Sequence, residues 1–332
     1  MKTRLMRGLL GVVPPVLFVA AALAGCDARP ARIESFPLSP ESEQRPPDVR
    51  ASIAKAMEAY FGTPVSPKVP KNEVVTGERL LAGGDHYRRL CLHCHGLAGD
   101  GAGPTAAFLQ PRPRDYRLGT FKFTSTAPDV KKPTRSDLMK TLKGGIMYTS
   151  MPAFGLLDDE TLESLVDYVV FLSMRGQFEK FLNVDYEEDP ELFDIDSMAE
   201  SDKDLVVSRW DETTESVVAP TVKPPEDVGA SIARGKDLYL DKKLQCLSCH
   251  GETGRGDGAG TDLLKDDWGF KIVPADLTKG IYRGGSRPKD LWLRIYSGVK
   301  GTPMPAFNGA LTPEQIWDVV NYVRSLAEPS TN

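Results

Sequence analysis

The chain has 332 residues, of which 41% are hydrophobic and 26% are charged, and its formal net charge is −5. This composition is ordinary for a globular protein and argues against wholesale disorder, a collagen-like fibre and a polytopic membrane protein. The negative charge gives a nucleic-acid partner no electrostatic support, so we expect none. The length suggests roughly two domains.

The first 25 residues have the features of an export signal. Three basic residues precede an apolar run over residues 8–24, which ends in small residues, as secretory signals do. The sequence Leu-Ala-Gly-Cys at residues 23–26 resembles the lipobox of bacterial lipoproteins, which implies cleavage before Cys26 and lipidation of Cys26. The alternatives are an ordinary signal with an incidental cysteine, and a membrane-spanning anchor, for which a short run broken by two prolines is poorly suited. We therefore expect an exported lipoprotein, anchored to a membrane and facing the periplasm.

Residues 26–74 are expected to form a tether and a short helix. Residues 27–47 are rich in Pro, Ser and charged residues, which predicts a flexible tether. Apolar residues recur along one face of residues 48–61, which predicts a helix that packs on the domain that follows.

Four short sequences occur twice in the same order. Their offsets are 155, 157, 153 and 154 residues. Four ordered matches at nearly one spacing indicate two copies of one domain, at residues 75–175 and 230–328. The matching pairs are 91–96 with 246–251, 99–103 with 256–260, 151–154 with 304–307, and 165–169 with 319–323.

Each copy is predicted to be mostly helical, so the fold class is all-α. Helices are expected over residues 80–90 and 232–244, before each Cys pair, and after Asp158 in the first copy. In the second copy a helix follows Thr312, which forms a capping box with Gln315. Between each Cys pair and the later Met-Pro sequence, frequent Gly and Pro predict mostly loop.

An acidic linker is predicted between the copies. Residues 176–229 hold 16 acidic and 4 basic residues, so the acidity of the chain is concentrated there. The linker also contains aromatic and aliphatic residues, which leaves open whether part of it packs on a domain.

Each copy contains the pattern Cys-x-x-Cys-His, at residues 91–95 and 246–250. This is the signature of covalent haem c attachment, because two thiols bond the vinyl groups at one edge of the porphyrin while the adjacent histidine reaches the iron. A zinc site would need two further N or S ligands, and the second copy has no other His or Cys. A redox-active or structural disulfide would not require an adjacent His in both copies. We therefore expect two covalent haems, held by Cys91, Cys94, Cys246 and Cys249.

The axial ligands of the iron follow by elimination. His250 is the only histidine of the second copy, and Met304 is the only methionine after residue 198, so bis-His ligation within that copy is impossible. A Met-Pro sequence recurs in the first copy at Met151, and thioether sulfur is a suitable ligand for haem iron. The predicted pairs are His95 with Met151 and His250 with Met304.

Four other residues of the first copy were weighed as ligands or as neighbours of the haem. Two methionines without counterparts in the second copy stay open as alternative ligands, and two histidines are expected at the surface or at the haem edge. These are Met139, Met147, His86 and His93.

With these motifs the chain resembles the class I cytochrome c family, present twice, over about residues 75–175 and 230–327. In that family a glycine on the first helix lets it cross the last helix closely against an aromatic residue. The resemblance assigns these roles to Gly84 with Tyr168 and to Gly235 with Tyr322.

The resemblance also implies how each haem is held. A proline carbonyl commonly orients the proximal histidine; Pro104 fits in the first copy, whereas Gly260-Thr261 stands at the matching place in the second. Aromatic and proline residues within 111–123 and 268–282 are expected to wall the haems. Residues 112–143 carry nine basic and three acidic side chains, which are candidates for binding haem propionates or an acidic partner.

The function expected is electron transfer between redox protein partners, with no catalytic residue. The protein would act as a shuttle or as the cytochrome subunit of a membrane respiratory complex. The alternative is a dihaem enzyme, peroxidase-like or oxidising a sulfur compound. Such an enzyme would need an open coordination position or a spare thiolate ligand, for which this sequence offers few residues.

Overall fold

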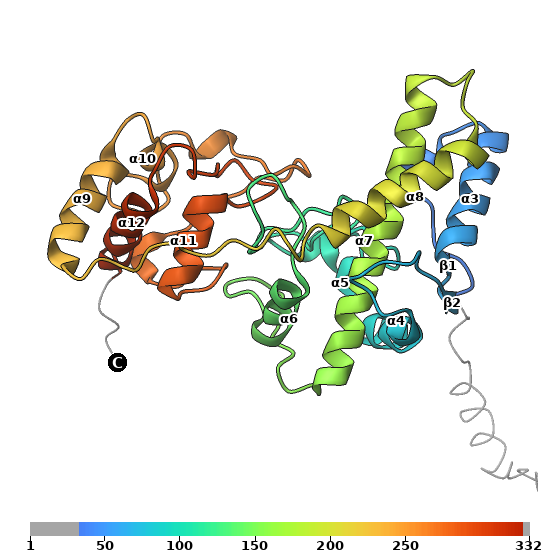
Figure 1. Ribbon diagram of the computed structural model, residues 1–332, viewed down its shortest axis with the longest axis horizontal. Helices are drawn as coiled ribbons and strands as arrows, with labels where there is room; N and C mark the ends of the chain where they lie inside the picture. Colours follow the sequence, from blue (N-terminus) through green and yellow to red (C-terminus); the bar gives the residue numbers. More distant parts are fainter. Residues whose placement is uncertain (1–32, 328–332) are drawn as a thin grey trace, which may run out of the picture. The chain divides into compact units, whose positions relative to one another are not determined.

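The computed structural model describes residues 33–327, and the predicted signal peptide and Cys26 lie outside them. The described chain is mostly helical, as predicted, with one short antiparallel pair of strands (Figure 1). Within this part of the chain no helix has both the length and the apolar character needed to cross a membrane. The helices are α2 (Pro40–Glu43), α3 (Pro47–Phe61), α4 (Leu80–Leu90), α5 (Leu92–His95), α6 (Arg135–Gly144), α7 (Asp159–Glu188), α8 (Ile195–Asp211), α9 (Val228–Leu240), α10 (Cys246–His250), α11 (Pro288–Ser297) and α12 (Pro313–Ser325). The strands are β1 (Gly62–Thr63) and β2 (Ser66–Pro67), and the 3-10 helices are η1 (Gly77–Arg79), η2 (Ala106–Phe108), η3 (Thr261–Leu263) and η4 (Leu277–Lys279).

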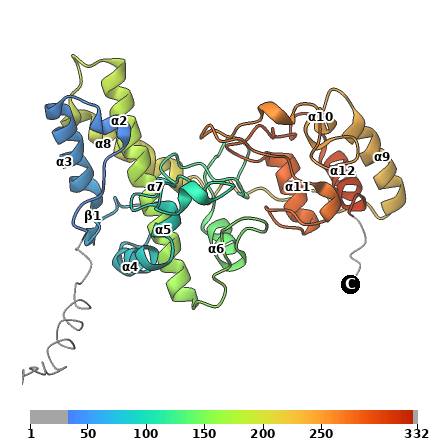
Figure 2. The same ribbon diagram turned by 180° about the vertical axis from the view of Figure 1, so that it is seen from behind.

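Two separate hydrophobic cores correspond to the two sequence copies. In the first, the apolar face of α7 packs on α4, and in the second α12 packs on α9 (Figures 1 and 2). Both of the later helices begin at the predicted residues. The Asp158 carboxylate accepts from the Thr161 amide at 2.7 Å, and Thr312 and Gln315 form the expected capping box.

A glycine permits the close helix crossing in each copy. A Cβ added at Gly235 would lie 2.0 Å from the Asp318 carbonyl oxygen and 2.9 Å from Cβ of Tyr322. In the first copy, the equivalent contact is made by Gly83, whose Cβ would lie 2.2 Å from a carbonyl oxygen of α7. The expected pairing of Gly84 with Tyr168 is also close, because a Cβ added at Gly84 would lie 2.9 Å from Cε2 of that ring, so Gly83 and Gly84 share this role.

The expectation of mostly loop before each methionine missed one helix in each copy. Helix α6 begins with a capping box in which the Asp137 amide donates to Thr134 Oγ1 at 3.1 Å, and it buries Leu138 and Leu142 one turn apart. Helix α11 occupies the corresponding place in the second copy. Both helices are short, and their cap and apolar spacing are obscured by the Gly and Pro residues around them.

The predicted flexible tether is wrong for residues 35–47, which are packed on the first domain. Phe36 and Ser42 are buried, and the Ser42 hydroxyl donates to the Glu179 carboxylate on α7 at 2.8 Å. The expected helix follows as α3, and it buries Ile53 and Met57 against the same core, as predicted. Apolar residues at 36 and 38 outweigh the polar composition of the segment.

Most of the acidic linker is also folded. Helix α7 continues 13 residues beyond the predicted end of the first domain, and α8 packs back on it. Trp210 of α8 is fully buried, and its indole Nε1 donates to Gln177 Oε1 at 3.0 Å. Most of the charged side chains of these helices are exposed, although Glu179 and Asp202 are buried, and the composition therefore resembled that of a solvated segment.

Candidate haem sites

A cavity of about 460 Å³ in the first domain brings the predicted site residues together. Its lining includes the side chains of the Cys-x-x-Cys-His motif and Met151. Most of the remaining wall is apolar, as expected for residues 111–123, although Asp115 pairs with Arg117 at 2.8 Å instead of lining this cavity. The apolar lining includes Pro113, Tyr116, Phe121, Phe123, Leu138 and Phe154.

His95 is held in the tautomer that a metal ligand needs. Its Nδ1 lies 3.0 Å from the Arg114 carbonyl oxygen, so the N–H at Nδ1 donates and Nε2 keeps its lone pair. Burial lowers the pKa of His95 to about 4, which keeps the ring neutral at pH 7. Tyr116 stacks on the imidazole with 4.7 Å between the ring centroids. The expectation that the Pro104 carbonyl orients His95 is therefore wrong, because the Arg114 carbonyl, ten residues later, does so.

The second domain repeats this arrangement. His250 Nδ1 lies 3.2 Å from the Ala275 carbonyl oxygen, and burial lowers the pKa of His250. The two carbonyls belong to the sequences Pro113-Arg114-Asp115 and Pro274-Ala275-Asp276. This Pro-x-Asp repeat marks the histidine partner in the sequence, but its offset of 161 residues lies outside the range of 153 to 157 of the other four matches.

The structural alignment of the glycine loops that follow the two histidines differs from the alignment of their sequences. Positive φ angles occur at residues 96, 99 and 101 and at residues 251, 254 and 256, an offset of 155. The Gly101 amide donates to the His95 carbonyl at 2.9 Å, as the Gly256 amide does to the His250 carbonyl at 2.8 Å. The match of 99–103 with 256–260, offset by 157, therefore does not pair equivalent residues.

Met151 and Met304 lie on turns of the same kind, one in each domain. The Met151 amide lies 3.1 Å from Thr149 Oγ1, and the Met304 amide lies 3.3 Å from Thr302 Oγ1. Each threonine hydroxyl in turn donates to the carbonyl three residues earlier. Because these side-chain contacts recur in both domains, the turn around each methionine has a defined conformation that its threonine stabilises.

Only one methionine of the first domain lies in the cavity with His95. Met151 lines it, whereas Met147 is 53% exposed and Met139 packs on the core outside the lining. Of the other histidines, His86 contacts Ser164 Oγ at 3.0 Å, and His93 is exposed at the edge of the cavity.

The four motif cysteines are free thiols. Burial raises the pKa of Cys91 to about 12 and that of Cys246 to about 11, so both thiols are protonated at pH 7. Within residues 33–327 no group of three or more His, Cys, Asp or Glu side chains is placed to hold a metal ion.

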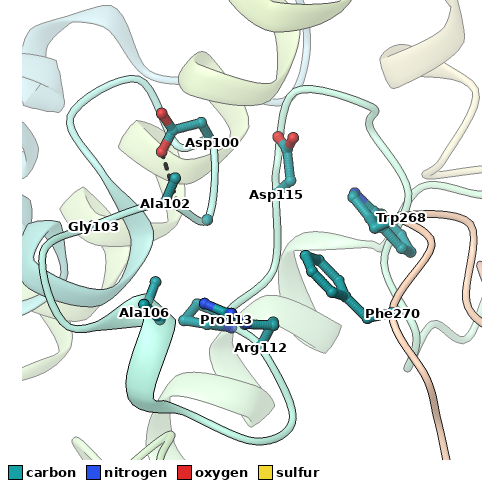
Figure 3. A pocket seen from close by; sticks show the side chains of 11 residues that line it. Asp100, Ala102, Gly103, Ala106, Arg112, Pro113, Asp115, Trp268 and Phe270 are labelled. Atoms are coloured by element: carbon teal, nitrogen blue, oxygen red, sulfur yellow. Dashed lines mark hydrogen bonds between the residues drawn. The ribbon is translucent and has the colours of Figure 1, made fainter.

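Not every expected wall residue of the second domain faces its own histidine. Trp268 and Phe270 instead contact the first domain, where the Arg114 guanidinium lies 3.6 Å from the Trp268 ring centroid and the Arg112 guanidinium 5.5 Å from the Phe270 ring centroid. Figure 3 shows these two aromatic rings beside Arg112 and Asp115.

Comparisons with known proteins agree with the two-domain organisation. The family model described as "Cytochrome C oxidase, cbb3-type, subunit III" matches residues 78–169, and the model described as "Cytochrome c" matches residues 232–327. The protein is therefore mostly helical with two cytochrome c domains.

Two individual proteins are similar to this chain. The Cbb3-type cytochrome c oxidase subunit FixP of Sinorhizobium medicae (strain WSM419) is 31% identical over 98 residues, which are 30% of this chain and 31% of that relative. The chain thus matches about a third of that relative's length. A chain in the structure of the Kuenenia stuttgartiensis reducing HAO-like protein complex Kustc0457/Kustc0458 is 31% identical, with a TM-score of 0.58, and the match covers 76% of this chain and 97% of that chain.

Proposed function

We propose that the protein is a dihaem electron carrier that holds one covalent haem c in each domain and passes single electrons between redox partners. One observation carries this proposal: a neutral histidine fixed through Nδ1 and a methionine on a threonine-braced turn occur in both domains. When bound, haem c supplies an iron couple that gains and loses one electron.

The residues of the first cavity fit a haem. The thiols of Cys91 and Cys94 line it and are the groups that form thioether bonds with vinyl carbons. His95 presents Nε2, and Met151 offers thioether sulfur to the same cavity. Aromatic and aliphatic walls exclude water and thereby favour a stable iron couple over ligand exchange. We assign the same roles in the second domain to Cys246, Cys249, His250 and Met304.

A histidine and a methionine in each domain that could both ligate the iron would favour electron transfer over the alternative of a dihaem enzyme. A peroxidase-like or sulfur-oxidising site needs one position open to substrate. In this chain a methionine turn is built in each domain, and its hydrogen bonds are the same in both.

We further propose that the protein is exported and anchored to a membrane through Cys26, where it serves redox protein partners as a shuttle or as a subunit of a respiratory complex. The lipobox-like sequence supports the anchor. The similarity to an oxidase subunit and to a chain of a protein complex supports a role within an assembly.

The stoichiometry of covalent haem tests the proposal directly. Mass spectrometry of the denatured protein, expressed with haem-maturation machinery, should show two haems, and the double variant Cys246→Ala, Cys249→Ala should show one. A wild-type chain with one covalent haem or none would overturn the proposal. Cys26→Ser should keep both haems and release the protein from membranes; a variant that stays bound in high salt would rule out the lipid anchor.

A further inference from the structure

A loop of the second domain lies at the cavity of the first. Arg283 is among the residues that line the cavity around His95 and Met151. The next residue, Gly284, touches the cavity wall itself, because a Cβ added there would lie 3.0 Å from Cδ1 of Phe123. The backbone of this loop is therefore so close to Phe123 that a side chain at residue 284 would crowd the wall.

Hydrogen bonds and an ion pair hold the two domains together beside this loop. The Arg294 guanidinium on α11 donates to the Lys122 carbonyl at 3.1 Å, and it also donates to the Thr124 carbonyl. The Lys122 ammonium lies 3.5 Å from the Asp266 carboxylate. These contacts bind the strip of chain that follows Phe121 to the second domain and fix the place of Arg283.

The lining of the cavity is positively charged. Five basic residues line it and no Asp or Glu does: Arg89, Arg112, Arg114, Lys122 and Arg283. Burial, together with the positive charges of Arg114 and Arg283, lowers the pKa of Lys122 to about 8, against the opposing effect of Asp266. Among these cations, within residues 33–327, only Lys122 is paired with a carboxylate. Such a group of cations at an apolar cavity is suited to a ligand that is apolar in its body and anionic at one edge.

The cations differ in whether they already contact an aromatic ring or a carboxylate. Arg114 stacks on Trp268, Arg112 lies over Phe270, and Lys122 pairs with Asp266. Arg283 is exposed, and within residues 33–327 it forms no hydrogen bond or ion pair. Its guanidinium is thus available to a carboxylate, which it can bind in a bidentate manner.

We propose that Arg283 of the second domain binds a propionate of the haem held in the first domain, so that the first haem site is completed by both domains. The inference rests on the proposed function, because it requires a haem in that cavity. A cation at the propionate stabilises the reduced state of the iron, which carries one positive charge less than the oxidised state. The second domain thereby sets the reduction potential of its neighbour.

The experiment compares Arg283→Gln with Arg283→Lys in the full chain. Both are made in a Met304→Ala background, where the far-red absorption band of sulfur-ligated oxidised haem comes from the first domain alone. A redox titration of that band then follows only the first haem. The matched control is Lys289→Gln, which removes one charge from an exposed position of α11 outside the lining of this cavity.

Arg283→Gln should shift the equilibrium of the first haem toward the oxidised state by about fivefold at low ionic strength, and less at high salt. Arg283→Lys should recover most of the shift, and Lys289→Gln should cause little. The inference is wrong if Arg283→Gln shifts the first haem no more than Lys289→Gln does. Failure of the proposed function would be visible separately, as a missing covalent haem or a missing far-red band before any titration.

Discussion

The backbone around the proximal histidine is the same in the two domains, whereas the segments that follow it differ in length. Gly103 and Pro113 are 10 residues apart, and their counterparts Gly258 and Pro274 are 16 apart. Farther along, the second domain is the shorter one: Tyr116 to Leu142 spans 26 residues, but Leu277 to Ile295 spans 18. Each domain therefore has one segment that the other lacks.

These two extra segments meet in the contact between the domains. The extra residues of the second domain carry Trp268, which stacks on Arg114, and Asp266, which pairs with Lys122. The extra segment of the first domain receives Lys300 of the second, whose ammonium lies 2.6 Å from the Ala127 carbonyl oxygen and 3.1 Å from Thr126 Oγ1. The shared parts of the repeat thus carry the residues that we propose to hold haem, and the parts that differ join the copies.

We expect the largest effect from substitutions that remove the proposed methionine ligand from one domain at a time. Met304→Ala should abolish the far-red band of the second haem, lower its potential and open a position for carbon monoxide, because that domain has no other His or Met. Met151→Ala should do the same in the first domain, since Met147 is half exposed and Met139 lies outside the cavity lining. Absorption spectra and carbon monoxide titrations measure both. Rapid carbon monoxide binding by the reduced wild-type protein would contradict six-coordination and favour the enzyme alternative.

A second comparison uses the glycines at the helix crossings. Gly235→Ala would place a Cβ 2.0 Å from the Asp318 carbonyl oxygen, and we expect the free energy of unfolding of the second domain to fall by about 3 kcal/mol. Gly83→Ala should have a similar effect on the first domain. Denaturant unfolding, followed by the absorption of each haem, gives the measurement.

The control for this comparison is Gly229→Ala on the same helix α9. Its Cβ would meet only the Asp227 side chain, at 3.5 Å, so helix propensity should make the substitution neutral or stabilising. If Gly84→Ala proved as harmful as Gly83→Ala, the residue-by-residue equivalence of the two crossings would be wrong.

The parts of the fold that the sequence predicted are those with local signals. The helix starts at Asp158 and Thr312 have cap residues. The histidine partner was assigned wrongly because the Pro-x-Asp repeat that marks the carbonyls of Arg114 and Ala275 has an offset of 161 residues, outside the spacing of the other matches.

The folding of residues 35–47 and of the acidic linker was harder to predict for a different reason. Their buried positions are few among many charged residues, and their packing partners lie elsewhere in the chain, mainly on α3 and α7. The contact between the domains depends on Trp268 and Arg294, whose partners Arg114 and Lys122 lie more than 150 residues away. The hydrophobic periodicity within either copy does not indicate a contact with a residue of the other copy.

The smallest predicted effect concerns Lys132, a buried lysine of the extra segment in the first domain. Its ammonium lies 5.9 Å from the centroid of the buried Trp210 ring, and burial lowers the pKa of Lys132 to about 8. The unfolded chain, with an ordinary lysine pKa near 10.4, binds more protons between pH 7 and 9, so stability should rise with pH in that window, by about 1 kcal/mol from this residue. Lys132→Met keeps the length of the side chain without the charge, and it should raise the free energy of unfolding at pH 7 and flatten its pH dependence. Chemical unfolding at pH 7, 8 and 9 tests this, with the exposed Lys131→Met as control. An equal slope in Lys132→Met and the wild type would show that the ammonium of Lys132 is solvated, and that the extra segment covers Trp210 less closely than its 0% exposure indicates.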